Sequence, residues 1–173
     1  KKVGLEQSAK DKLKTFSGGM IRRIGIAQTL LNSPMILLLD EPTAGLDPQE
    51  RIRLRNILSG LSEHCIVLLS THIVSDVELI ADKVILLNDG TLLAADRVND
   101  LLHNLRGMVW SFCLSKAELQ EMSDECLIGN VIQNDRNIQV RVVSRNKPHK
   151  NAVSLPPTME DLYLFYFQGG DTH

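Results

Sequence analysis

The chain has 173 residues, of which 43% are hydrophobic and 4% aromatic, so an aliphatic core can fill one ordinary domain or slightly more. The formal net charge of −2, with lysines and arginines spread along the sequence, gives no electrostatic case for a nucleic acid as the main partner. We find no secretory signal and no apolar run near the roughly 20 residues that span a bilayer, so any membrane role is expected to need a partner protein.

The first part of the chain is expected to alternate helices and strands. Apolar residues at helical spacing predict a helix from Gly18 to about Asn32, which is ended by Ser33-Pro34. Two continuous apolar runs, Met35–Leu39 and Cys65–Leu69, predict strands buried on both faces, as in a parallel sheet. This alternation favours an α/β fold.

Further signals define the elements around these strands. Asp47-Pro48-Gln49-Glu50 offers a capping residue, a proline for the first helical position and an acid for a capping box, which predicts a helix through Leu61. The following elements are expected to be a short helix over Thr71–Ala81, a hairpin over Lys83–Ala95 and a helix over Asp96–Leu105. Asp89-Gly90 suits the type I′ turn of that hairpin.

The composition changes at Arg106-Gly107, after which all the aromatic residues except Phe16 occur. We therefore predict one domain over residues 1–105 and a small α+β domain over residues 106–173. The second domain is expected to contain strands over Met108–Leu114, Leu127–Gln133 and Ile138–Ser144, a helix over Ser115–Met122 with a Ser115/Glu118 capping box, a turn over Asn134–Asn137, and a last helix over Pro157–Phe167.

The three cysteines, Cys65, Cys113 and Cys126, cannot all pair with one another. Cys65 and Cys113 lie in apolar runs, so we expect buried free thiols in a reducing compartment. No Cys-x-x-Cys pair or His/Cys cluster indicates a zinc site.

Two adjacent acids, Asp40 and Glu41, follow the first predicted strand. The carboxyl edge of an open α/β sheet is where ligands bind, so one acid can hold Mg²⁺, usually through water, and the other can orient and deprotonate an attacking water. Taken alone, the same residues also fit a strand exit with two solvated acids.

The segment Ser17-Gly18-Gly19 opens a predicted helix. Two glycines let the backbone approach a ligand, and free amides at a helix start favour an anion, although a flexible loop with a serine cap fits equally well. Asp47 can be only a helix cap. His72, which follows Ser70-Thr71, can be structural or can donate a hydrogen bond to developing negative charge.

These pieces occur in one order, and together they are specific. The segment from about Phe16 to Ala95 resembles the nucleotide-binding domain of ABC-type (ATP-binding-cassette) ATPases. Phe16–Met20 resembles the signature loop, with Phe and Met where Leu and Gln are more usual. The other matching segments are Ile36–Asp40 for the Walker B strand, Glu41 for the catalytic glutamate, Ala44–Asp47 for the D-loop and His72 for the switch histidine.

The resemblance implies a partial P-loop NTPase fold in which two domains pair head to tail around two ATP molecules. Ser17, Gly18 and Gly19 are then expected to contact the γ-phosphate of ATP held by the opposite subunit, and Asp47 to communicate across the dimer. Asp40 is expected to hold Mg²⁺, Glu41 to activate water, and His72 to contact the γ-phosphate.

The 173 residues contain no Gly-x-x-x-x-Gly-Lys-Ser/Thr phosphate loop. We therefore expect a truncated piece with poor ATP affinity and negligible hydrolysis by itself. Unpaired sheet edges are expected to favour a dimer or aggregate.

The signature loop, together with Glu41–Pro48 and Pro156–Tyr163, resembles the ATPase subunits of ABC-2-type exporters of the bacitracin- and daunorubicin-resistance kind. The resemblance implies a cytoplasmic subunit, peripheral on the inner face of the cell membrane, that drives a separate membrane permease. An ABC ATPase of translation or DNA repair, or a non-catalytic dimerisation fragment, remains an alternative.

Overall fold

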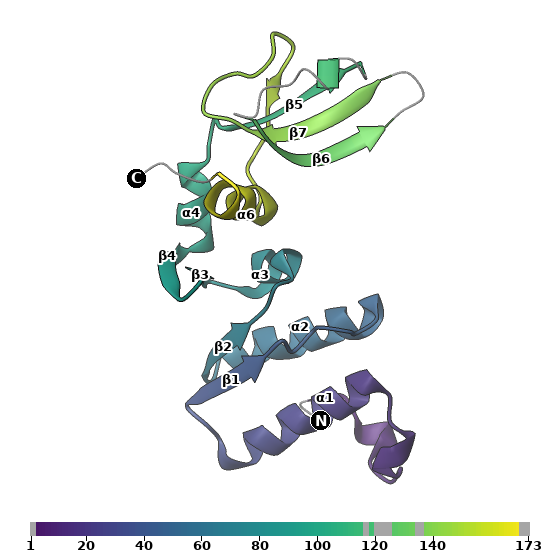
Figure 1. The fold of residues 1–173 in the computed structure, drawn as a ribbon. Helices are drawn as coiled ribbons and strands as arrows, with labels where there is room; N and C mark the ends of the chain where they lie inside the picture. The colour runs from purple at the N-terminus through teal and green to yellow at the C-terminus, as the bar shows by residue number, and fades with distance from the viewer. Residues whose placement is uncertain (1–2, 116–117, 120–125, 134–136, 170–173) are drawn as a thin grey trace. The chain divides into compact units, whose positions relative to one another are not determined.

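The computed structural model describes residues 3–115, 118–119, 126–133 and 137–169, and the chain divides into two compact units, Lys1–Asp76 and Val77–His173 (Figure 1). The elements just before the expected domain boundary at Leu105 belong to the second unit. A division into compact units does not define a domain, so that boundary stays a prediction.

The first unit begins with short 3-10 turns, which are followed by a long helix. Two strands come next, and a second helix separates them in sequence. Helix α1 spans Gly18–Thr29, strand β1 Ile36–Asp40, helix α2 Pro48–Ser62 and strand β2 Ile66–Ser70, with 3-10 turns at Glu6–Ser8, Leu13–Thr15 and Leu30–Asn32. Strands β1 and β2 pair in parallel from Ile36↔Ile66 to Asp40↔Ser70. Helix α2 buries Leu54, Leu58 and Leu61 within this unit. The predicted helices and parallel strands are confirmed here.

The two strands are buried on one face only, so the expectation of burial on both faces is wrong. Leu37 is 3% exposed, whereas Leu38 is 69% and Ile66 is 65% exposed. Within the described part of the first unit, no element covers the face that carries Leu38. An apolar run identifies a strand, but burial of both its faces depends on what packs against it.

The start of α2 follows the predicted signals except at Glu50. Asp47 is the N-cap, with its side chain accepting from the Glu50 amide at 2.9 Å, and Pro48 occupies the first turn. The Glu50 carboxylate does not close a capping box, because it lies 3.1 Å from Arg23 and 3.0 Å from Arg53. Two arginine partners therefore replace the expected contact with the backbone.

The second unit contains most of α3 (Val74–Ile80), an antiparallel hairpin and an antiparallel sheet. Strands β3 (Lys83–Asn88) and β4 (Thr91–Arg97) meet at Asp89 and Gly90, whose φ angles of 47° and 77° suit the predicted type I′ turn. Helix α4 spans Val98–Asn104 and leads to the sheet. Among the described residues this sheet has the order β6-β7-β5-β8, with β5 at Val109–Leu114, β6 at Leu127–Gln133, β7 at Ile138–Val143 and β8 at Val153–Ser154.

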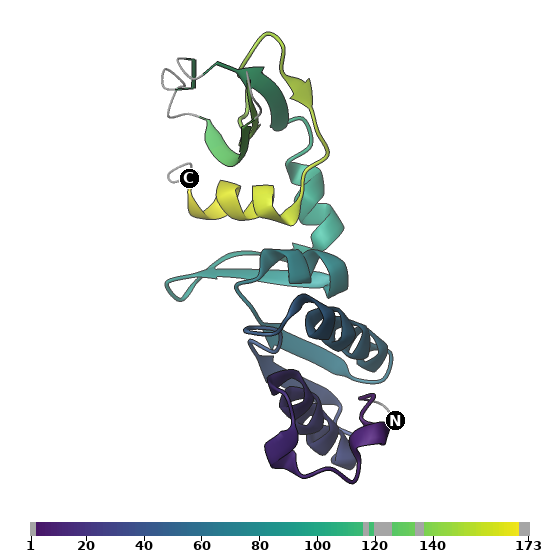
Figure 2. The ribbon, with the colours of Figure 1, turned by 90° about the vertical axis from the view of Figure 1, so that its right-hand side faces the viewer.

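The last helix, α6, spans Met159–Phe167 and packs against β6, β7 and α4 (Figure 2). An ion pair fixes it to the sheet, because Arg141 of β7 lies 2.6 Å from Asp161, which is 1% exposed. Residues of β5 and β7 that alternate with Arg141 face the other side of the sheet and form a core cluster with Ala152; they are Phe112, Leu114, Ile138, Val140 and Val142. The small α+β arrangement expected after Arg106 is therefore present.

Two other predictions concern the second unit. Ser115 and Glu118 make the reciprocal contacts of a capping box, with the Ser115 amide donating to Glu118 at 2.8 Å. The rest of the helix expected over Ser115–Met122 and most of the turn at 134–137 lie outside the described residues. Among the described residues, no helix is both long enough and apolar enough to cross a membrane.

The cysteines are free, but they are not buried as expected. Cys65 and Cys126 are half-buried, and Cys113 is exposed. Cys113 lies between the buried residues Phe112 and Leu114 on β5, so strand alternation turns it to the other face of the sheet.

Candidate functional site

The polar cluster of the first unit lies where β1 and β2 end side by side. Because Asp40 pairs with Ser70 in register, the parallel strands bring their last residues to the same edge. The Ser70 hydroxyl donates to Asp40 Oδ1 at 2.5 Å and accepts from the Glu41 amide at 3.2 Å. Ser70 therefore joins the two acids, a role that the sequence analysis did not assign to it.

Glu41 stands at the centre of this cluster. Its Oε1 accepts from the His72 backbone amide at 3.1 Å and lies 2.8 Å from His72 Nδ1. Because an ionised carboxylate only accepts hydrogen bonds, Nδ1 is the donor in that pair. Glu41 Oε2 is buried, and within the described residues it has no hydrogen-bond partner.

This geometry suits a base for a water molecule. One carboxylate oxygen of Glu41 is fixed by His72, and the other, which is buried, is an acceptor without a donor among the described residues. A buried acceptor without a donor loses hydrogen-bond energy, so a donor that reaches Oε2 would be stabilised there. The structure thus brings Asp40, Glu41 and His72 together, as the sequence analysis expected, while their catalytic roles stay predictions.

The two glycines of the predicted anion-binding loop, at the start of α1, have different surroundings. Ser17 is the N-cap of α1, and its hydroxyl oxygen accepts from the Met20 amide at 3.2 Å. A methyl group on Gly18 would meet no atom within 4 Å, so a ligand can approach there. A methyl group on Gly19 would lie 2.6 Å from a carboxylate oxygen of Glu50. Packing against Glu50 therefore favours glycine at position 19, and the expected contact of Gly19 with phosphate stays a prediction.

The two glycines make a matched pair for mutation. Gly19→Ala is expected to lower the free energy of unfolding by about 1–3 kcal/mol, because the methyl group displaces Glu50 from Arg23 and Arg53. Gly18→Ala is expected to leave it unchanged or to raise it by up to about 1 kcal/mol through helix propensity. Urea unfolding followed by circular dichroism measures both, and equal stability of the two variants would contradict the packing role of Gly19.

Asp47 and its loop are explained locally. Gly45 has a φ of 71°, which favours glycine, and Asp47 is exposed while it caps α2. Capping therefore accounts for Asp47 within this chain, and its expected role across a dimer stays a prediction.

Two arginines of α1 were missed by the sequence analysis. Arg23 is 5% exposed and donates to the carbonyls of Val3 and Gly4 at 3.2 and 3.3 Å, besides its pair with Glu50. Arg22 donates to the backbone carbonyls of Glu41 and Pro42. The apolar residues at helical spacing lie on another face of α1. Hydrogen bonds from Arg22 and Arg23 to backbone carbonyls have no signature in the sequence.

Asp40 and Glu41 offer a small set of oxygen ligands for Mg²⁺. No group of three or more His, Cys, Asp or Glu side chains suited to a metal occurs in the described parts of the chain. Mg²⁺ in nucleotide sites needs only one or two carboxylates, with waters and phosphate oxygens completing the shell. The exposed carboxylate of Asp40 fits that limited role.

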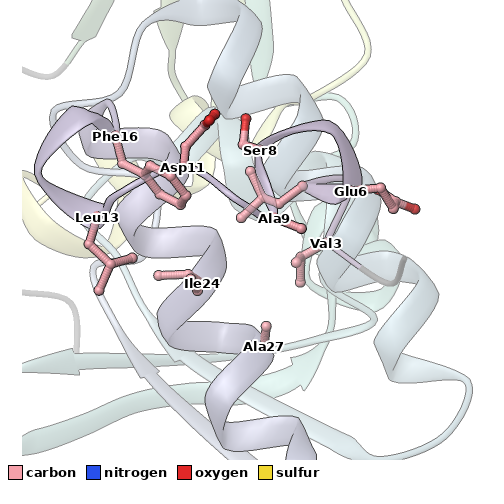
Figure 3. Close-up of a pocket in the computed structure, with 10 residues that line it drawn as sticks. Val3, Glu6, Ser8, Ala9, Asp11, Leu13, Phe16, Ile24 and Ala27 are labelled. Atoms are coloured by element: carbon pink, nitrogen blue, oxygen red, sulfur yellow. The ribbon is translucent and has the colours of Figure 1, made fainter.

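A separate pocket of about 540 Å³ lies between the N-terminal 3-10 turns and α1 (Figure 3). Its lining residues include Val3, Leu13, Phe16, Ile24 and Ala27, with Glu6 and Asp11 among the polar ones. Asp40, Glu41 and His72 are not among these residues. This pocket is therefore distinct from the cluster at the ends of β1 and β2.

Comparisons with known proteins agree with these features. A family model described as "ABC transporter" matches residues 1–44, a stretch that contains Ser17–Gly19, Asp40 and Glu41. The linearmycin resistance ATP-binding protein LnrL of Bacillus subtilis is 40% identical over 106 residues, which are 61% of this chain and 34% of that protein. The Nod factor export ATP-binding protein I of Rhizobium etli is 31% identical over 180 residues, which are 92% of this chain and 54% of that protein.

A third relative is an uncharacterized ABC transporter ATP-binding protein, YdbJ of Bacillus subtilis, which is 36% identical over 157 residues, 87% of this chain and 49% of that protein. The chain thus spans between about a third and about half of the length of these relatives. The family match and the similarity over both units lead to one conclusion: the chain belongs to the ABC transporter ATP-binding proteins.

Proposed function

We propose that this chain supplies the water-activating and phosphate-sensing part of an ATPase that drives an export-type ABC transporter. The observation that carries the proposal is the Glu41 carboxylate, which is fixed by His72 on one oxygen and has no hydrogen-bond donor among the described residues on the other. The names of two relatives, one for linearmycin resistance and one for Nod factor export, support export as the direction.

In this proposal each residue at the strand ends has one task. Glu41 takes a proton from the attacking water, while His72 keeps the carboxylate in place. Asp40 helps to hold Mg²⁺ through water, and Ser70 orients Asp40 by its hydroxyl group. The metal, when bound, supplies positive charge to the phosphate oxygens.

The loop at the start of α1 is proposed to serve a second ATP, held by another subunit. Gly18 is open to a ligand, and the free amides at the helix start favour the γ-phosphate. Such a helix end stabilises an exposed charge by only about 0.3–1 kcal/mol, so another protein surface must bind the rest of the nucleotide. A head-to-tail dimer, with Asp47 at its interface, provides that surface.

The further partners of the complete protein are a membrane permease and a second ATPase subunit. The proposed location is the cytoplasm, at the inner face of the cell membrane. The permease is proposed to select the exported substrate.

Mixed dimers test whether the site is shared between subunits. Gly18→Asp places a carboxylate in open space, where it repels phosphate without crowding the fold, and Glu41→Gln removes the base. Each variant of the full-length protein alone is expected to lack hydrolysis in a single-turnover assay. Mixing them produces dimers in which one site contains an intact loop from one subunit and an intact Glu41 from the other.

The expected result is that the mixture recovers hydrolysis that neither variant shows alone. Two separate preparations of Gly18→Asp, mixed and handled identically, serve as the control. This mixture is expected to show no hydrolysis, because every loop in it carries the substitution. Absence of recovery in a mixture shown by mass spectrometry to contain mixed dimers would contradict the shared site.

A further inference from the structure

Arg22 connects α1 to the end of β1 through two hydrogen bonds. Its Nη1 donates to the backbone carbonyls of two consecutive residues, Glu41 and Pro42, the second at 2.8 Å. Arg23 also donates to two consecutive carbonyls, those of Val3 and Gly4, but it binds the Glu50 carboxylate as well. Within the described residues, the hydrogen bonds of Arg22 go to the carbonyls of Glu41 and Pro42.

The backbone that Arg22 holds is in an unfavourable conformation. Glu41 has a φ of 44°, in the left-handed region that non-glycine residues rarely adopt. The following residue is Pro42, and a residue before proline prefers an extended conformation. Such a conformation persists only where its surroundings hold it, and it often occurs at functional sites.

Ser70 and Arg22 hold the Glu41 backbone from its two sides. The Glu41 amide donates to the Ser70 carbonyl at 3.1 Å and also lies near the Ser70 hydroxyl. Arg22 binds the carbonyl on the other side of the same residue. The direction of the Glu41 side chain, and so its contact with His72, follows from a backbone that is fixed at both its amide and its carbonyl.

We propose that Arg22 is a positioning residue that fixes Glu41 for its action on water and couples Glu41 to the loop at Ser17–Gly19. Arg22 lies on α1, which begins at this loop, so a shift of the loop moves the guanidinium that holds Glu41. Binding of phosphate at the loop thereby changes the position of the base. The inference rests on the proposed function of Glu41.

A first experiment needs no nucleotide. The His72 backbone amide donates to Glu41 Oε1, so its hydrogen exchange reports whether the carboxylate is in place. In Arg22→Gln this amide is expected to exchange about tenfold faster, the effect of losing about one hydrogen bond. Arg53→Ala, which removes an exposed arginine from α2, serves as the matched control and is expected to leave the His72 amide unchanged.

The result separates positioning from general stability. Faster exchange confined to the residues around Glu41 and His72 supports the proposal. Unchanged exchange at His72, or an equal increase throughout α1, α2, β1 and β2, overturns it. Because no ATP is present, this outcome does not depend on whether the protein hydrolyses ATP.

A second experiment measures steady-state ATP hydrolysis by the full-length protein. Arg22→Gln is expected to lower kcat about 10- to 100-fold, the range for a misplaced catalytic group, with the KM for ATP changed less than about twofold. Arg22→Lys keeps a positively charged nitrogen that can donate to the carbonyls but loses the planar guanidinium, so it is expected to retain an intermediate kcat.

The variants Glu41→Gln and Arg53→Ala complete this experiment. If Glu41→Gln abolishes turnover while Arg22→Gln behaves like Arg53→Ala, the positioning role is wrong and the proposed function stands. If Glu41→Gln itself has no effect, the proposed function is wrong. A parallel loss of kcat, ATP affinity and thermal stability in both Arg22 variants also overturns the positioning role.

Discussion

Glu41→Gln is expected to lower the ATP turnover of the full-length protein about 10²- to 10⁴-fold, the range for removal of a general base. Glutamine keeps the shape of the side chain and still offers an oxygen to the His72 amide and Nδ1. It cannot accept a proton, and its NH2 group, which only donates, replaces one of the two acceptor oxygens of the carboxylate. Binding of ATP is therefore expected to persist while hydrolysis stops.

A coupled-enzyme assay measures turnover, and a fluorescent ATP analogue measures binding. Glu63→Gln is the matched control, because Glu63 is an exposed acid at the end of α2. It is expected to hydrolyse ATP at the unsubstituted rate. Turnover by Glu41→Gln within a factor of about three of that rate would remove Glu41 from the mechanism, since a general base contributes at least about 10²-fold.

The sequence predicted the elements of the first unit better than their surroundings. Apolar runs, a proline and an aspartate were enough to find β1, β2 and α2, because strand and helix signals are local. The exposure of Leu38 and Ile66 was missed, since burial depends on distant elements that no local pattern describes. The exposure of Cys113 was missed for the same reason. An apolar run predicts the strand β5, but it does not say which face of the sheet each residue of the strand occupies.

The candidate site was predicted in part for a similar reason. Asp40, Glu41 and His72 occupy strand ends, and parallel strands bring such ends together. Arg22 was missed because it binds backbone carbonyls, and any residue type presents the same backbone. The role of Ser70 was missed because its contacts with Asp40 and Glu41 depend on the register of two strands that are distant in sequence. The crowding of Gly19 by Glu50 was missed because Glu50 is distant in sequence, and the expected contact of Gly19 with phosphate stays a prediction.

The buried ion pair of the second unit leads to the largest expected effect on stability. Arg141 donates to both carboxylate oxygens of Asp161, at 2.9 and 2.6 Å, and Thr158 donates to Asp161 Oδ2 through its amide and its hydroxyl. One carboxylate thus closes the capping box of α6 and fixes the helix to β7. Asp161→Asn places an amide donor against these donors and leaves Arg141 without its counter-charge.

Asp161→Asn is therefore expected to lower the free energy of unfolding of the second unit by about 3–5 kcal/mol, the cost of breaking a buried pair. Trp110, the single tryptophan, lies in β5 of this unit, so its fluorescence during urea unfolding reports the change. Glu160→Gln, an exposed neighbour in the same turn of α6, is the control and is expected to change the free energy by less than about 0.5 kcal/mol.

The same pair predicts a dependence on pH. Burial alone would raise the pKa of Asp161, but the hydrogen bonds from Arg141 and Thr158 outweigh it and hold the pKa below its ordinary value. The stabilisation is therefore fully present above the pKa of the unfolded chain, about 3.9, and is lost as the pH falls through the lower pKa of the folded state. The difference in unfolding free energy between the unsubstituted protein and Asp161→Asn is thus expected to be constant near neutral pH and to shrink below about pH 4. A difference that stays constant into strong acid would show that packing at Asp161, rather than its charge, stabilises α6 on the sheet.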